Sequence, residues 1–256
     1  MFSMQRFGAM MILLLAAWGC GSEQPQLTFH GVVGGSRITD TADPSMKSTV
    51  ALFSRGDIVC TGTLIGMQHV VTAAHCLGGN GQSGLESVGF GANGRMFTSS
   101  IIAQAINPFY QGMNGPMDLG SAADIALLIF ADSINSYIEP VEIAPVPMSG
   151  PVLVAGYGVT AETRNDSGTL RKVNTRINYV VNQEFALAPD GRGACYGDSG
   201  GPAYRVNNGK LQLIGATSRA GRSQSCNGGD GIFTSVFPFK SWLQNKAAAL
   251  GYPMNP

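Results

Sequence analysis

The chain has 256 residues, of which 44% are hydrophobic and only 12% are charged, so it is long and apolar enough to bury a sizeable core. Its 16 Lys and Arg residues balance 16 Asp and Glu residues. Without a basic run or an excess of positive charge, the chain lacks the electrostatic footprint of a nucleic-acid-binding protein. The composition indicates a soluble globular protein.

The first 20 residues differ from the rest. A start with one positive side chain, Arg6, precedes an almost wholly apolar run over residues 7–19. That run is too short for an ordinary membrane span and is typical of a secretory signal peptide, which implies an oxidising destination. The small residues before Cys20 resemble the lipobox of bacterial lipoproteins, in which the cysteine becomes the lipid-modified N-terminus. We therefore expect an exported bacterial protein, either anchored in the cell envelope through a lipid on Cys20 or secreted with a spare cysteine.

Residues 21–31 are polar and aperiodic and are expected to form a tether or propeptide, so that structure begins near Val32. Beyond that point, 35 Gly residues distributed among short Val/Ile/Thr-rich runs favour many short strands joined by tight turns. The first set of strands is expected at 49–53, 58–65, 69–72, 96–105 and 125–130. The Gly-rich stretch 78–94 predicts a loop.

The stretch 131–151 carries four prolines and predicts a connector between two halves. A second set of strands is expected to begin at Val152, to include 170–181 and 210–217, and to end at 232–236. Pro238 is placed to open a C-terminal helix whose apolar face would carry Trp242, Leu243 and Leu250. The pattern as a whole predicts an all-β protein.

Three short motifs carry groups suited to nucleophilic catalysis. Ser199 lies in Gly-Asp-Ser-Gly-Gly-Pro, His75 in Thr-Ala-Ala-His-Cys and Asp124 in Ala-Asp-Ile-Ala-Leu-Leu. A serine hydroxyl is a poor nucleophile until a base removes its proton, and a buried carboxylate helps that base. Each motif also has a structural interpretation: a turn, a packed or metal-binding histidine, and the start of a strand.

In the order His, Asp, Ser, these motifs resemble those of the chymotrypsin- and trypsin-like serine proteases. Further matches extend the resemblance over about residues 32–250: Val32-Val33-Gly34-Gly35 at the family's mature N-terminus, then 106–110, 156–158, 231–234 and Trp242. The resemblance implies two antiparallel six-stranded β-barrels, at about 32–139 and 140–256, with the active site in the cleft between them.

The resemblance also implies a mechanism and its residues. Ser199 would attack the scissile carbonyl, His75 would transfer the proton, and Asp124 would fix the His75 tautomer. The backbone N–H groups of Gly197 and Ser199 would form the oxyanion hole. No metal or organic cofactor is required, and the substrates would be proteins or peptides. The competing classes are a catalytically inactive binding protein on the protease fold and an esterase.

The cysteines admit more than one interpretation. With Cys20 assigned to lipid, four remain, and four cysteines allow three disulfide pairings. A zinc site is disfavoured, since no two cysteines lie two to four residues apart and no histidine pair accompanies them. The resemblance alone selects the pairs Cys60–Cys76 and Cys195–Cys226.

Activation and specificity are likewise implied by the resemblance. A cut between Gly31 and Val32 by an activating protease would free an ammonium group that pairs with Asp198. Gly31 stands where a trypsin-like activator would need Lys or Arg, so the activator is expected to differ.

The substrate pocket is expected at Gly193, Ala194, Ser218, Arg219, Ala220 and Gly231. Its floor, Gly193-Ala194, resembles that of elastases and predicts cleavage after small to medium apolar residues. Asp230 is the alternative, because a carboxylate near the pocket would attract a basic side chain.

Overall fold

The structure is a computed structural model that describes residues 32–78, 84–92, 95–112, 123–132, 138–222 and 224–254. The expected signal peptide, tether and lipidation at Cys20 lie outside these residues. Among the residues described, no helix is both long and apolar enough to span a membrane.

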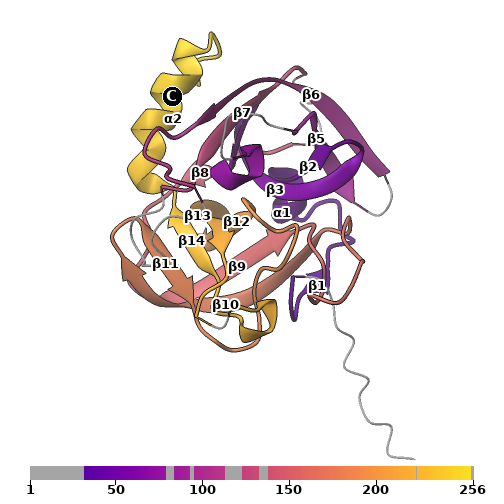
Figure 1. The fold of residues 1–256 in the computed structure, drawn as a ribbon, viewed down its shortest axis with the longest axis vertical. Helices are drawn as coiled ribbons and strands as arrows, with labels where there is room; N and C mark the ends of the chain where they lie inside the picture. The colour runs from indigo at the N-terminus through magenta and orange to yellow at the C-terminus, as the bar shows by residue number, and fades with distance from the viewer. Residues whose placement is uncertain are drawn as a thin grey trace, which may run out of the picture.

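The first half of the chain forms a closed antiparallel barrel in the order β2-β3-β4-β7-β6-β5 (Figure 1). Its strands are β2 (Thr49–Ser54), β3 (Asp57–Gly66), β4 (His69–Thr72), β5 (Ser87–Ala92), β6 (Arg95–Ile106) and β7 (Ala126–Phe130). The expected strands of this half are present. The loop expected over 78–94 is wrong in its second part, because β5 forms there.

The second half forms a six-stranded ring in the order β10-β11-β14-β13-β12-β9, which closes by pairing of β9 with β10. Its strands are β9 (Gly150–Gly156), β10 (Arg171–Val181), β11 (Glu184–Leu187), β12 (Pro202–Asn207), β13 (Lys210–Arg219) and β14 (Ile232–Ser235). Two short strands lie outside the ring: β1 (Ser36–Arg37) pairs with β10, and β8 (Glu142–Ile143) pairs in parallel with β13. The predicted fold class is confirmed.

Strand β7 explains why residues 125–130 are continuously apolar. Successive side chains of a strand point to opposite faces. Ala126, Leu128 and Phe130 pack inside the first barrel, whereas Leu127 and Ile129 join a cluster shared with the second barrel and the C-terminus. Both faces of this strand are therefore buried, which fixes the position of the segment that leads into it, Asp124 included.

The described residues form few helices. They are α1 (Pro44–Ser48), α2 (Lys240–Ala249) and the 3₁₀ turns η1 (Ala74–Leu77), η2 (Cys226–Gly228) and η3 (Phe237–Phe239). The predicted C-terminal helix is present, but Pro238 lies in η3, and α2 begins two residues later. Leu243 and Ala247 are its buried residues.

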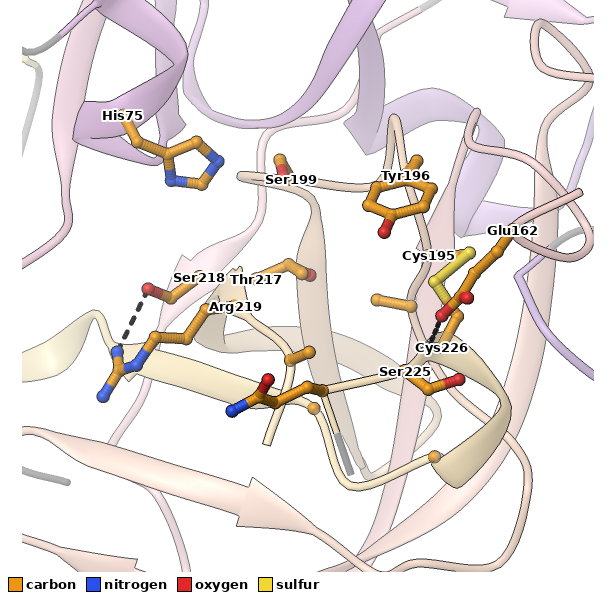
Figure 2. Close-up of a pocket in the computed structure, with 15 residues that line it drawn as sticks. His75, Glu162, Cys195, Tyr196, Ser199, Thr217, Ser218, Arg219, Ser225 and Cys226 are labelled. Carbon is orange, nitrogen blue, oxygen red and sulfur yellow. Dashed lines mark hydrogen bonds between the residues drawn. A yellow bond between two sulfur atoms is a disulfide. The ribbon is translucent and has the colours of Figure 1, made fainter. Parts of the chain in front are cut away.

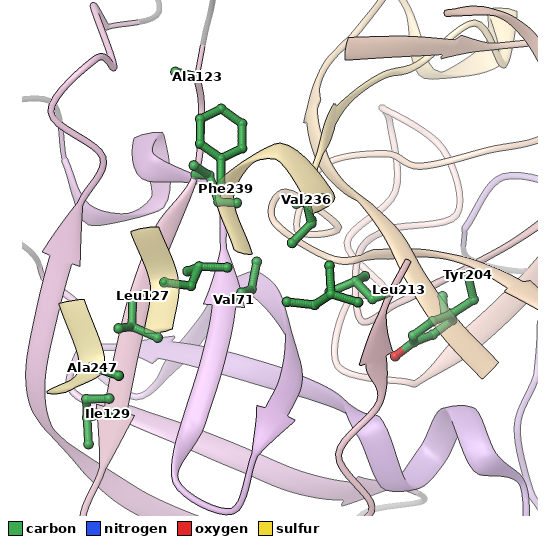
Figure 3. Close-up of a cluster of buried hydrophobic side chains, with 14 of the residues drawn as sticks. Val71, Ala123, Leu127, Ile129, Tyr204, Leu213, Val236, Phe239 and Ala247 are labelled. Carbon is green, nitrogen blue, oxygen red and sulfur yellow. The ribbon is translucent and has the colours of Figure 1, made fainter. Parts of the chain in front are cut away.

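Figure 3 shows the cluster that joins the two halves. Val71 and Leu127 of the first barrel belong to one cluster with Leu213 of the second, and Phe239 and Ala247 near the C-terminus complete it, Ala247 beside Ile129 of β7. Trp242 and Leu250 pack against the cluster while remaining partly exposed. This shared core fixes the two barrels relative to each other, which matters because the site lies between them.

Candidate active site

His75 and Asp124 are brought together by the pairing of two strands. Thr72 at the end of β4 is the partner of Ala126 at the start of β7. His75 follows β4 in turn η1, and Asp124 lies two residues before the start of β7. The His75 Nδ1 atom lies 2.8 Å from Asp124 Oδ2, and the His75 backbone N–H donates to Asp124 Oδ1 at 3.0 Å. The carboxylate thus holds both the ring and the backbone of the histidine.

Asp124 is buried, with 1% of its side chain exposed. Burial on its own raises the pKa of a carboxyl group, but the hydrogen bonds from His75 and from the Ser218 hydroxyl, 2.7 Å from Oδ2, outweigh it and hold the pKa of Asp124 below its ordinary value. Asp124 is therefore ionised at neutral pH and only accepts hydrogen bonds. Burial, and then the charge of Asp124, raise the pKa of the neighbouring Tyr110 to about 12, so that phenol stays neutral.

Ser199 lies in a tight turn just before β12. Gly197 and Gly200 both have positive φ, 91° and 77°, a conformation that glycine adopts without steric cost. A Cβ on Gly200 would lie 1.9 Å from Thr72 Oγ1, so the turn presses directly on the first barrel. Thr61 reinforces the contact, since its backbone N–H donates to Ser199 O at 2.9 Å and its hydroxyl to Gly197 O at 2.8 Å.

The backbone N–H groups of Gly197 and Ser199 donate to no protein acceptor within the described part of the chain. Next to them, the carboxylate of Asp198 is fully buried and accepts from the N–H groups of Gly158, at 2.8 Å, and Cys195, at 2.9 Å. Burial raises the pKa of Asp198 to about 7, even though these hydrogen bonds act against the rise.

A cavity of about 280 Å³ contains both His75 and Ser199. Figure 2 shows the imidazole turned toward Ser199 along one rim, with the Cys195–Cys226 disulfide on the far side. The lining is mostly apolar. It comprises His75, Glu162, Ala194, Cys195, Tyr196, Ser199, Thr217, Ser218, Arg219, Ala220, Gln224, Ser225, Cys226, Gly229 and Gly231.

Most of the expected pocket residues line this cavity, but Gly193 does not. Its N–H donates to Val33 O at 3.1 Å, and a Cβ on it would lie 3.3 Å from the carbonyl oxygen of Gly229. Asp230 is also absent from the lining, and its carboxylate lies beside Gly221.

Glu162, which was not expected from the sequence, is the acid that lines the cavity. Its carboxylate accepts from the Cys226 N–H at 2.7 Å, which holds it against the disulfide. A single Glu in a polar stretch gives no signal in the sequence, because the contact spans 64 residues.

The two expected disulfides are present. Cys60 pairs with Cys76 and ties β3 to the turn that carries His75, while Cys195 pairs with Cys226 across the pocket wall. His75 lies beside the first pair. Oxidised sulfur offers no thiolate to a metal ion, which removes the zinc interpretation for these cysteines.

The geometry defines a class of protein: two antiparallel barrels with a histidine–aspartate pair and a serine in one cavity between them. A family model described as Trypsin matches residues 32–243, so the chain belongs to the trypsin family and is a chymotrypsin-like serine endopeptidase. Among curated proteins it is similar to chymotrypsin-like elastase family member 1 of Homo sapiens, 29% identical over 92% of this chain and 100% of the relative. The protein of that name from Rattus norvegicus is 28% identical over 91% and 96%.

Proposed function

We propose that Ser199, His75 and Asp124 form the catalytic unit of this endopeptidase and that it cleaves peptide bonds after small to medium apolar residues. The observation that carries the proposal is the shared cavity, in which the imidazole bound to buried Asp124 faces the Ser199 hydroxyl. The presence of a nucleophile, a base and a group that orients the base in one cavity supports a role in acyl transfer.

Ser199 Oγ attacks the substrate carbonyl while His75 takes its proton through the ring nitrogen that does not face Asp124. The same proton then passes to the leaving amine as the acyl-enzyme forms. A water molecule then attacks the acyl-enzyme, with His75 again taking and returning the proton, and the carboxylic acid product leaves Ser199. Asp124 keeps the Nδ1 proton of His75 in place and stabilises the imidazolium that forms in each half of the reaction.

The N–H groups of Gly197 and Ser199 are proposed as the oxyanion hole. Because neither N–H donates to an acceptor among the described residues, both can donate to the substrate oxygen as its negative charge develops. Gly197 supports this arrangement through its positive φ, which a side chain would strain.

Active-site titration with an organophosphonate tests this function against a binding protein on the same fold. One equivalent should become attached to Ser199 of the processed protein. A protein that takes up no phosphonate would be a binding protein, and a protein that cleaves simple esters but no peptides would be an esterase.

The proposed specificity rests on a mostly apolar pocket, in which the charged lining residues are Glu162, held by the Cys226 N–H, and Arg219, which is paired with Glu184. Ala194, Ala220, Gly229 and Gly231 supply only methyl groups or backbone to the lining. A substrate Lys or Arg would lose its hydration there with little to replace it, whereas Ala, Val or Leu would bury apolar surface. The relatives named elastase are consistent with this preference.

A panel of peptides that vary the residue before the cut tests this specificity. We expect kcat/KM for Ala, Val or Leu to exceed that for Lys or Arg by at least about tenfold. Glu162→Gln should lower any residual cleavage after Lys or Arg, because Glu162 lines the cavity, while Asp230→Asn should change it less. Strong cleavage after Lys or Arg that Asp230→Asn abolishes would contradict both statements.

We further propose that the enzyme is made as an exported precursor, activated by a cut between Gly31 and Val32. Val32 is fully buried, and Val33 forms a β-bridge with Gly193, next to the pocket segment. The two disulfides fit an oxidising compartment. If Cys20 carries a lipid anchor, the same cut would release the active enzyme from the envelope.

A further inference from the structure

Arg219 lies at the end of β13, where the strand pairing is irregular. The partners pass from Thr217 with Phe233 to Arg219 with Ile232, so Ser218 is an extra residue on its strand. Such a bulge redirects the side chains beside it. Here Ser218 points at Asp124 and Arg219 reaches toward β11.

Arg219 forms a two-pronged ion pair with Glu184, the first residue of β11. Nη1 lies 2.5 Å from Oε1 and Nη2 lies 3.0 Å from Oε2. Only 10% of the Arg219 side chain and 0% of the Glu184 side chain is exposed. Because water reaches neither group well, the loss of one partner leaves a poorly solvated charge on the other. The two side chains therefore hold one positive and one negative charge in place beside the cavity, which Arg219 lines.

The ion pair is connected to the catalytic pair through one hydroxyl. Arg219 Nη1 lies 3.3 Å from Ser218 Oγ, as the dashed line in Figure 2 marks, and Ser218 Oγ lies 2.7 Å from Asp124 Oδ2. A guanidinium only donates and a carboxylate only accepts, so the Ser218 proton must point at Asp124 while its lone pair faces Arg219. Glu184, Arg219, Ser218, Asp124 and His75 form one continuous series of contacts.

We propose that the Glu184–Arg219 ion pair is a positioning element of this active site, which holds the Ser218 hydroxyl on Asp124 and so sets the pH at which His75 becomes protonated. The proposal rests on the roles proposed above for Asp124 and His75. Neither Glu184 nor Arg219 takes part in bond making, and both act through Ser218.

Each substitution in the ion pair is expected to shift the titration midpoint of His75 in a definite direction. Arg219→Met removes a cation and weakens the Ser218 hydrogen bond to Asp124, so Asp124 favours the imidazolium more strongly and the His75 midpoint rises. Glu184→Gln leaves the cation without its counter-charge and should lower the midpoint. The double variant removes both charges and should return close to the parent value.

Other titratable groups around the catalytic pair are common to every variant. Tyr110 approaches Asp124 and stays neutral, and Glu162 and Tyr196 line the same cavity. None of them is altered, so differences between the midpoints report the ion pair.

The test is an NMR titration of the His75 imidazole in the Ser199→Ala protein, which needs no turnover. We expect the midpoint to rise by about 0.5 pH unit in Arg219→Met, to fall by about as much in Glu184→Gln, and to return to within about 0.2 unit in the double variant. With Ser218→Ala present, the effect of Arg219→Met should shrink to less than about half, because the connecting hydroxyl is gone.

Arg192→Met is the matched control, since it breaks an exposed pair with Asp190, at 2.8 Å, in the same barrel. Shifts of one sign in both single variants, or shifts no larger than in this control, would overturn the proposal. An Arg219 effect that persists in full with Ser218→Ala would overturn the role of the hydroxyl. Glu184→Gln is nearly isosteric, so its downward shift is required even if Arg219→Met does not fold.

This outcome is separable from that of the proposed function. Phosphonate attached to Ser199 without the paired midpoint shifts would refute the positioning role alone. The shifts without any phosphonate uptake would refute the proposed catalysis while leaving the coupling in place.

Discussion

Replacing Ser199 with Ala is expected to reduce amide hydrolysis by about six orders of magnitude while leaving the fold intact. The loss is this large because the acyl-enzyme cannot form without the hydroxyl, and only the oxyanion donors and substrate binding remain. His75→Ala should cost about as much, and the double variant little more, since the residues act as one unit. Steady-state cleavage of a peptide substrate, with circular dichroism to verify folding, provides the measurement.

A matched control uses a serine outside the cavity. Ser149 is exposed and absent from the pocket lining, so Ser149→Ala should leave activity unchanged. Appreciable peptide cleavage by Ser199→Ala would show that the nucleophile has been assigned wrongly.

Cleavage between Gly31 and Val32 is expected to abolish the pH dependence of stability contributed by Asp198 above about pH 4. In the uncut chain, burial raises the pKa of this carboxyl from 3.8 to about 7. A folded-state value above the unfolded one means that the contribution to stability is complete below about pH 4, falls as the pH rises toward 7, and is constant above that. At 1.36 kcal/mol per pH unit, the loss is on the order of 4 kcal/mol.

The new ammonium group would favour the ionised carboxylate and remove this loss. The backbone supports the cut as well, because Val32 has a φ of 50°, which is strained for a β-branched residue, and φ is no longer constrained at a free N-terminus. Buried Asp198 would then have a counter-charge beside the turn that carries Ser199.

Urea unfolding between pH 4.5 and 7.5 measures this effect in the uncut and processed Ser199→Ala proteins. Other carboxyl groups with shifted pKa values do not interfere in this range. The pKa values of Asp43, Asp124 and Asp166 are below their ordinary value, so their stabilisation of the folded state is lost only as the pH falls below about 4. Asp198→Asn in the uncut chain should abolish the decline in stability with pH.

The position of the cut has a test of its own. N-terminal sequencing of the active form should begin at Val32, and an active species beginning at Cys20 would contradict the scheme.

The proposed catalytic residues could be recognised in the sequence because such chemistry requires particular residues in short, local contexts. Gly197 and Gly200 adopt a backbone conformation that favours glycine, and His75 and Asp124 flank two strongly apolar strands. Strand β5 was missed because Gly89 and Gly91 resemble a loop. In the structure a Cβ on Gly89 would lie 2.5 Å from the Phe53 ring, so a bulky neighbour fills the space of the absent side chain.

The walls of the pocket could not be predicted because they depend on distant contacts. Glu184 follows Asn182 and Gln183 and resembles part of a solvated turn, yet it is buried against Arg219, 35 residues away. Gly193 was expected at the pocket floor by counting back from Cys195; in the structure it forms a β-bridge with Val33 and is not among the residues that line the cavity.

The turn that carries Ser199 belongs to the second barrel but is held by the first. Thr61 donates to it from two atoms, and Gly200 leaves no room for even a methyl group against Thr72. The second barrel produced alone would lack these contacts and the shape they impose on the nucleophile. A slight separation of the barrels would move Ser199 away from His75 while every strand remained paired. Loss of activity on heating should therefore precede loss of β-structure, and residual activity would measure how closely the two halves are docked.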